Sequence, residues 1–138
     1  MSEEIAQSNA ALHESYRQIS TQAQQLYEAS IRDGLTGLYN RRHFDAVVDR
    51  LIVEAQYSAA PLALAIADID DFKRINDGFS HATGDAVLRA LAALLIAEAR
   101  PGDVVARYGG EEFTLAFPNA DLATATALCE RLRQRVET

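Results

Sequence analysis

Three acidic residues stand at positions where a fold could bring their carboxylates together. Asp68 ends an apolar run, and Glu111 and Glu112 follow the pair Gly109-Gly110. If the two segments form neighbouring strands, the three carboxylates converge at one edge of a sheet. Such a cluster suits Mg²⁺, which bridges carboxylates to substrate phosphates, and two such ions can stabilise an in-line attack on phosphorus. Acidic residues at strand ends are also ordinary solvated groups, so the spacing alone leaves both interpretations open.

The composition restricts the ligands that this chain can take. Its 138 residues are 49% hydrophobic, enough for one domain with a core and one appended element. The formal net charge of −7 argues against nucleic acid as a partner, because phosphate-backbone binders carry a basic face. A nucleotide triphosphate would need a divalent cation between its phosphates and the acidic residues.

The chain has the features of a protein from a reducing compartment. Cys129 is its only cysteine, so no intramolecular disulfide can form. The first residues are acidic where a signal peptide would be basic, and no apolar run approaches the ~20 residues of a membrane span. We therefore expect a cytoplasmic location and no membrane contact by this chain.

The first 30 residues are polar, lack glycine and proline, and predict a helix. Ile5, Leu12, Ile19 and Leu26 follow one another at intervals of seven and form a narrow seam. The seam is compatible with a weak, parallel two-stranded coiled coil, which makes dimerisation a hypothesis. The alternative is a solvated helix that packs on its own domain, since a seam this polar is marginal by itself.

Residues 32 to 58 predict a hinge followed by a helix. Gly34 and Gly37 break the helical pattern, and Asn40 is a good N-cap for the next helix. Apolar residues from Phe44 to Ala55 then recur at the spacing of an amphipathic helix.

Three strands are predicted after this helix. The run that Pro61 opens is apolar throughout, which is typical of a central strand buried on both faces. Residues 103–108 and 113–117 predict a hairpin, in which Gly109 and Gly110 supply the positive φ angles of a tight turn.

Helices are predicted between and after these strands. A short helical piece covers 71–76, a longer helix covers 84–98, and Asp121 can cap a last helix. The order of strands and helices is that of an α+β, ferredoxin-like βαββαβ unit that lacks its last strand.

Three long strings carry a resemblance to a known family. RDGLTGLYNRRHFD (32–45), ADIDDFKRINDGFSHATGDAVL (67–88) and RYGGEEF (107–113) together resemble the GGDEF family of diguanylate cyclases. The resemblance implies a nucleotidyl-cyclase-like fold and a GGDEF domain over 32–138 that lacks its C-terminal strands and helix. Residues 1–31 resemble the helical linker that often precedes this domain.

The resemblance implies a metal site and two catalytic glutamates. Asp68, the backbone carbonyl of Ile69, Glu111 and Glu112 match positions that bind Mg²⁺, with Mn²⁺ as the alternative. Glu111 matches the residue often assigned to activating the attacking 3′-hydroxyl group. Which of the two glutamates has which role stays open.

The resemblance also implies a GTP site. Asn76 and Asp85 match the pair that reads guanine, and the turn from Asp70 to Lys73 matches the segment that wraps the triphosphate. Glycines at the hairpin would let the backbone approach the α-phosphate. The implied substrate-binding residues are Phe72, Lys73, Asn76, Asp85, Gly109 and Gly110.

An RxxD pair resembles the family's inhibitory product site. Arg100 and Asp103 stand just before RYGGEEF, with Arg131, better placed by spacing than Arg133, as a further contact. Without its fixed spacing from RYGGEEF, we would interpret the pair as a charged residue at a helix end and a turn residue. Arginine can bind the phosphates of a product or stack on guanine.

Two functions follow from the resemblance. The first is a diguanylate cyclase, which condenses two GTP molecules into cyclic di-GMP and two pyrophosphates at a homodimer interface and is inhibited by its product. The alternative is a catalytically incomplete module that binds cyclic di-GMP or transmits dimerisation. Ser80 departs from the family, which has glycine there, and its side chain is expected to strain the loop before His81.

Overall fold

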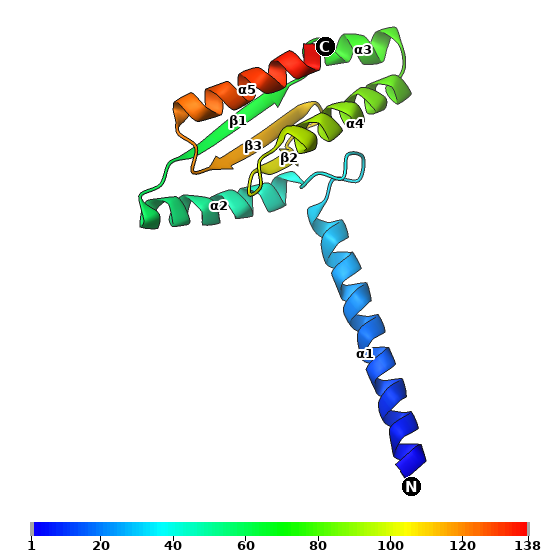
Figure 1. Cartoon of the computed structure of the whole chain (residues 1–138). Helices are drawn as coiled ribbons and strands as arrows, with labels where there is room; N and C mark the ends of the chain where they lie inside the picture. Colours follow the sequence, from blue (N-terminus) through cyan, green and yellow to red (C-terminus); the bar gives the residue numbers. More distant parts are fainter. Residues whose placement is uncertain (1, 138) are drawn as a thin grey trace. The chain divides into compact units, whose positions relative to one another are not determined.

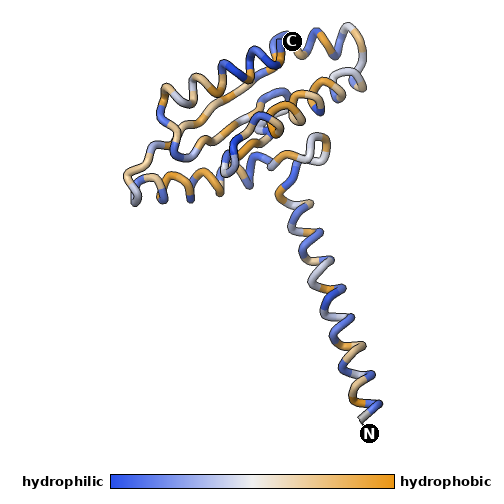
Figure 2. The backbone as a smooth tube through the Cα atoms, viewed as in Figure 1, coloured by the Kyte–Doolittle hydropathy of each residue, from blue (hydrophilic) through white to orange (hydrophobic). Residues whose placement is uncertain are grey.

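The computed structural model describes residues 2–137, which fall into two compact units with the boundary between Ile31 and Arg32. The first unit is a single helix, α1 (Ser2–Ile31), so the predicted helix is present. Its seam residues Ile5, Leu12, Ile19 and Leu26 are all exposed. Figure 2 shows isolated hydrophobic positions along a mostly hydrophilic helix. No helix in residues 2–137 is long and apolar enough to cross a membrane.

The second unit is a small α+β domain built on a three-stranded antiparallel sheet (Figure 1). The strands lie in the order β1-β3-β2, so β3 pairs with both others. The strands are β1 (Leu62–Asp68), β2 (Val104–Arg107) and β3 (Glu112–Pro118). The helices are α2 (Arg41–Ser58), α3 (Phe72–Gly78), α4 (His81–Glu98) and α5 (Leu122–Glu137).

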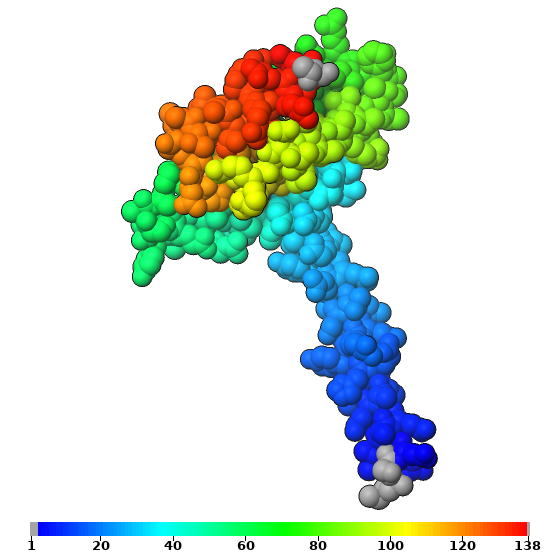
Figure 3. Space-filling view, viewed as in Figure 1, coloured from blue at the N-terminus to red at the C-terminus, as the bar shows by residue number. Residues whose placement is uncertain are grey.

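Helices cover the two faces of the sheet unequally. Successive residues of β3 alternate between faces, so Phe113, Leu115 and Phe117 enter one buried cluster and Ala116 enters another. The larger cluster also holds Leu88 of α4 and Ala125 of α5. These two helices contact each other, and Figure 3 shows them side by side. The smaller cluster forms under α2 alone.

The strand from Leu62 is present, but its predicted place in the sheet is wrong within the described chain. β1 is an edge strand there, and its outward-facing Leu64 and Ile66 are 54% and 75% exposed. The alternate alanines of β1 pack against the larger cluster. The buried side chains of α2, in contrast, pack on β2 and β3, and the other face of β1 stays exposed at Leu64 and Ile66.

The predicted helix caps are confirmed. The Asn40 side chain accepts a hydrogen bond from the His43 N–H (2.9 Å), and Asp121 accepts one from the Thr124 N–H (2.8 Å). Ser80 caps α4 in the same way through the Thr83 N–H. The predicted strain at Ser80 is therefore wrong. Its φ of −178° is extended backbone that any residue adopts, and its hydroxyl satisfies a free helical donor.

Candidate active site at the hairpin tip

Two of the three predicted metal-binding carboxylates face each other across the sheet. In the antiparallel register of β1 and β3, Asp68 is the direct partner of Glu112. The Cβ atoms of such a pair lie about 4.5–5.5 Å apart, on the same face. Both residues are exposed, and neither has an ion pair with a lysine or arginine in the part of the chain that the structure describes. Two neighbouring carboxylates without a cation repel each other, and a divalent cation would relieve that repulsion.

Glu111 is not part of the same cluster. Among residues 2–137, no group of three or more His, Cys, Asp or Glu side chains is arranged to hold a metal ion. Glu112 begins β3 and pairs with Asp68, whereas Glu111 precedes the strand in the bend of the hairpin and is half-buried. The expected convergence of three carboxylates is therefore wrong in its full form, and the structure brings together Asp68 and Glu112.

The glycine pair of the hairpin is not required for the backbone conformation of the turn, as we had predicted it to be. Neither Gly109 nor Gly110 has a positive φ, so the turn does not need glycine for its backbone conformation. At Gly109, however, an added Cβ would lie 3.0 Å from the Glu112 Oε2 atom, whereas at Gly110 it would meet nothing within 4 Å. Gly109 thus leaves room for the Glu112 carboxylate.

Arg107 joins the hairpin tip to the loop that follows α1. Its guanidinium donates from Nε and Nη2 to the Gly110 carbonyl oxygen (3.2 and 2.8 Å). The same group binds both carboxylate oxygens of Asp33 through Nη1 at 3.3 Å. Asp33 in turn accepts hydrogen bonds from the backbone and the hydroxyl of Thr36. Residues 32–40, predicted to be a hinge, therefore form a hydrogen-bonded loop attached to the sheet.

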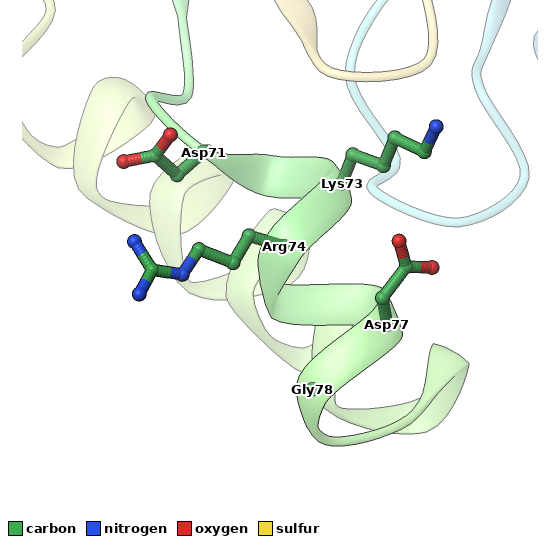
Figure 4. A pocket seen from close by; sticks show the side chains of 5 residues that line it. All are labelled: Asp71, Lys73, Arg74, Asp77 and Gly78. Carbon is green, nitrogen blue, oxygen red and sulfur yellow. The ribbon is translucent and has the colours of Figure 1, made fainter.

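An open hollow lies on the outer side of α3. Its lining consists of Asp71, Lys73, Arg74, Asp77 and Gly78. Figure 4 shows Lys73 and Asp77 directed to one side of the helix, and Asp71 and Arg74 to the other. Asp71 has a φ of 58°, in the left-handed region, directly before the helical residues that follow. Backbone N–H groups at such a transition form a concavity that accepts anionic oxygens.

The two residues predicted to read guanine lie on adjacent helices. Asn76 is on α3, and Asp85 is half-buried on α4, which packs against α3. The Asn76 Oδ1 atom is buried and has no hydrogen-bond partner within residues 2–137. Buried side-chain acceptors without a partner are uncommon in folded proteins, so this amide is a candidate for ligand binding.

Comparison with known proteins identifies the family. The family model described as "Diguanylate cyclase, GGDEF domain" matches residues 30–138. The chain belongs to the GGDEF family. It is 43% identical over 109 residues to the response regulator PleD of Caulobacter vibrioides, covering 79% of this chain and 24% of PleD. It is 38% identical over 131 residues to the diguanylate cyclase VdcA of Vibrio cholerae, covering 95% of this chain and 37% of VdcA.

Solved structures agree with this assignment. The coiled coil and GGDEF domain of DgcB from Caulobacter crescentus, in complex with c-di-GMP, is 34% identical with a TM-score of 0.85. That match covers 89% of this chain and 64% of the DgcB chain. The diguanylate cyclase SiaD of Pseudomonas aeruginosa, in complex with its activator SiaC, is 38% identical with a TM-score of 0.71, covering 93% of this chain and 50% of SiaD. The chain thus spans less than two fifths of PleD or VdcA and a half to two thirds of these solved chains.

The RxxD pair of this GGDEF domain forms a closed turn. Arg100 donates to both oxygens of Asp103, through its backbone N–H at 2.8 Å and through Nε and Nη2 at 2.9–3.3 Å. Pro101 and Gly102 fill the turn, and Gly102 has the φ of 89° that the third position of a type II turn requires. The Asp103 side chain is 1% exposed and that of Arg100 is 32% exposed. Arg100 therefore remains within reach of a ligand, whereas Asp103 holds it in place.

Arg131, the predicted further contact of this site, has a partner near the end of α4. Its Nε atom pairs with Glu98 at 3.2 Å, and its Nη2 atom donates to the Glu98 carbonyl oxygen. Arg135 pairs with the other oxygen of the same carboxylate. Arg133 is engaged elsewhere, with Glu130 and Glu137 along α5. Figure 2 shows how hydrophilic this half of α5 is.

Several residues of this site were missed by sequence reasoning. Asp33 and Arg107 lie inside the family strings but were given no role, although they connect segments 74 positions apart. Glu98 was also missed because its contacts to α5 depend on how two helices pack. A local pattern carries no signal for such contacts, since only the fold brings the residues together.

The ion pair of Asp33 predicts a pH dependence of stability. Burial raises the pKa of Asp33, but hydrogen bonds from Thr36 and the charge of Arg107 outweigh it, so the pKa lies below the ordinary value of 3.8. Ionised Asp33 therefore stabilises the folded state above that value, and the contribution is lost as the pH falls through the lowered folded pKa. We expect the difference in unfolding free energy between wild type and Asp33→Asn to be constant above about pH 5 and to shrink below it.

Urea unfolding of both proteins between about pH 3 and pH 6 measures this difference. Other carboxylates titrate in both proteins, so the difference isolates Asp33. A difference that grows toward acid pH would contradict the assignment.

Proposed function

We propose that this protein is a diguanylate cyclase that condenses two GTP molecules into cyclic di-GMP and releases two pyrophosphates. The observation that carries the proposal is the cross-strand pairing of Asp68 with Glu112 at the open end of the sheet. It agrees with the family membership of residues 30–138. The named cyclases that this chain resembles give the reaction its chemistry.

The metal would be held at this pair. Asp68, Glu112 and the backbone carbonyl of Ile69 offer the hard oxygen ligands that Mg²⁺ or Mn²⁺ prefers. When bound, the ion neutralises phosphate charge and polarises the α-phosphate. Glu111, which lies in the bend directly before β3, is the residue available to accept the proton of the attacking 3′-hydroxyl.

Base and triphosphate would be bound by α3 and α4. The carboxylate of Asp85 can accept hydrogen bonds from the guanine N1–H and its exocyclic amine, which adenine does not offer, and the Asn76 amide lies on the neighbouring helix. Lys73 and the backbone N–H groups after Asp71 provide positive potential for phosphate oxygens. Gly109 and Gly110 let the hairpin backbone approach the α-phosphate.

The reaction requires two protomers. The 3′-hydroxyl of each GTP attacks the α-phosphorus of the other, so one domain presents one nucleotide and its partner presents the second. The exposed seam of α1 is a surface through which two copies can associate as a parallel coiled coil. A cytoplasmic location agrees with the substrate, since GTP is a cytoplasmic nucleotide.

Removing the carboxylate charge at the pair tests the metal site. Glu112→Gln and Asp68→Asn should each lower Mg²⁺-dependent turnover of GTP by about a hundredfold or more, because each removes one anionic ligand. Pyrophosphate release and cyclic di-GMP formation by the full-length protein measure the effect. Glu54→Gln, an exposed glutamate on α2, is the matched control and should retain activity. Wild-type turnover by Glu112→Gln would remove the metal-site proposal.

The closed Arg100–Asp103 turn supports the second proposed role, binding of the product cyclic di-GMP. Arg100→Ala should weaken cyclic di-GMP binding about tenfold or more, the loss expected for one charge-assisted hydrogen bond, and should leave turnover intact. Arg131→Ala should also weaken it, because Arg131 contacts Glu98, two residues before Arg100. Arg133→Ala should not, because both partners of Arg133 lie on α5 itself. Titration calorimetry distinguishes the variants. Equal affinities for wild type and Arg100→Ala would exclude the site, and binding without any turnover would favour the non-catalytic module.

The α1 seam predicts a dimer that a single charge disrupts. Ile19→Asp places a carboxylate in the seam of both helices and should shift the protein toward monomer, because the buried charge has no partner there. Thr21→Asp lies on the opposite side of the same helix and is the control. Sedimentation equilibrium measures both. Identical association of the two variants would show that the seam does not hold the dimer.

A further inference from the structure

The contact between α3 and α4 is unusually close at one point. A Cβ atom added at Gly84 would lie 1.8 Å from the Asn76 Oδ1 atom, 2.9 Å from Asn76 Cγ and 3.3 Å from Phe72 Cζ. A real Cβ atom does not approach a non-bonded heavy atom below about 3.0 Å. The Asn76 side chain therefore occupies the space that any other residue at position 84 would fill.

Backbone conformation gives no reason for glycine at this position. Gly84 lies inside α4 and has no positive φ, so a residue with a side chain could adopt the same backbone. Glycine within a helix is less stable than alanine, because it loses more conformational freedom on folding. The gain that offsets this cost is the space left for Asn76.

Hydrogen bonds do not explain the position of Asn76 either. Its buried Oδ1 atom has no partner within residues 2–137, so the amide is held there by packing against Gly84. An asparagine amide otherwise rotates broadly about χ2. Packing that removes this freedom before a ligand arrives lowers the cost of ordering the side chain on binding.

We propose that Gly84 is a positioning residue for guanine recognition: its missing side chain holds the Asn76 amide beside Asp85, the next residue on α4. This inference rests on the proposed function, since Asn76 and Asp85 are there the pair that reads the base. Gly84 itself does not touch the nucleotide. It acts only through Asn76, which makes the two positions energetically coupled.

A double-mutant cycle tests the coupling. We would measure binding of the α,β-methylene analogues of GTP and ATP, with Mg²⁺, to the full-length wild type, Gly84→Ala, Asn76→Ala and the double variant. Gly84→Ala should lower affinity for the GTP analogue about tenfold or more while affinity for the ATP analogue changes less than about twofold. In the Asn76→Ala background, Gly84→Ala should change neither affinity by more than about twofold, because the atoms it would meet are gone.

Thermal unfolding of the same four proteins gives a second readout, which also covers a Gly84→Ala variant that folds poorly. Asn76→Ala should restore the melting temperature that Gly84→Ala lowers, since the remaining contact, to Phe72, needs a shift of only tenths of an ångström. Gly34→Ala is the control, because Gly34 has open space around it and no positive φ, and it should leave both readouts unchanged.

The outcomes separate this inference from the proposed function. Losses of affinity and melting temperature that persist in the Asn76→Ala background would overturn the role of Gly84. Equal loss for the GTP and ATP analogues would overturn the link to base recognition and leave a structural glycine. A wild type that does not prefer the GTP analogue would overturn the proposed function and the guanine role with it, while the thermal cycle would still decide whether Gly84 and Asn76 are coupled.

Discussion

The antiparallel register of β1 against β3 is the constraint on which the site depends. Because side chains alternate along a strand, the register that pairs Asp68 with Glu112 also puts the alanines of β1 and the aromatic residues of β3 on the face under α4 and α5. A slip by one residue would move Glu112 to the other face and the aromatic side chains out of the core. Burial of Phe113, which follows Glu112 directly, therefore fixes the acidic tip more firmly than any contact of the tip itself.

Close contacts also fix the positions of the parts of the site that lie outside the sheet. Arg107, at the end of β2, holds the Gly110 carbonyl and the Asp33 carboxylate with one guanidinium, so the hairpin tip and the loop after α1 share a support. Gly109 and Gly84 each leave space for a side chain of the proposed site, Glu112 in one case and Asn76 in the other. At Gly109 and Gly84, glycine is needed because it has no side chain. At Gly37 and Gly102, it is needed because the backbone has a positive φ.

Local physics explains what could be predicted from the sequence. The N-caps Asn40 and Asp121, the helix periodicities and the hairpin are set within a few residues, and all were predicted. The errors concern relations between elements. The apolar run of β1 indicated burial on both faces, but α2 packs on β2 and β3 and leaves Ile66 exposed. The three carboxylates were expected to converge, yet residues 2–137 contain no such group of three, and Glu111 lies in the bend before β3, outside the pairing with β1. Ser80 was expected to strain its loop, and it caps α4 instead.

The two proposed sites lie at opposite ends of β3, and this separation restricts how product could act on turnover. Glu112 begins the strand, whereas Arg100 donates to the carbonyl oxygen of Pro118 at its other end. Seven residues at about 3.3 Å each span roughly 20 Å. A product bound at Arg100 therefore does not cover the metal pair of its own domain. Residues 113–117 of β3 are buried, and a close-packed interior is hard to compress. The domain is therefore expected to move as one rigid body. Product bound at Arg100 would thus inhibit by changing the position of one domain relative to the other in a dimer. This requires the product to contact both protomers, and it requires no conformational change within a protomer.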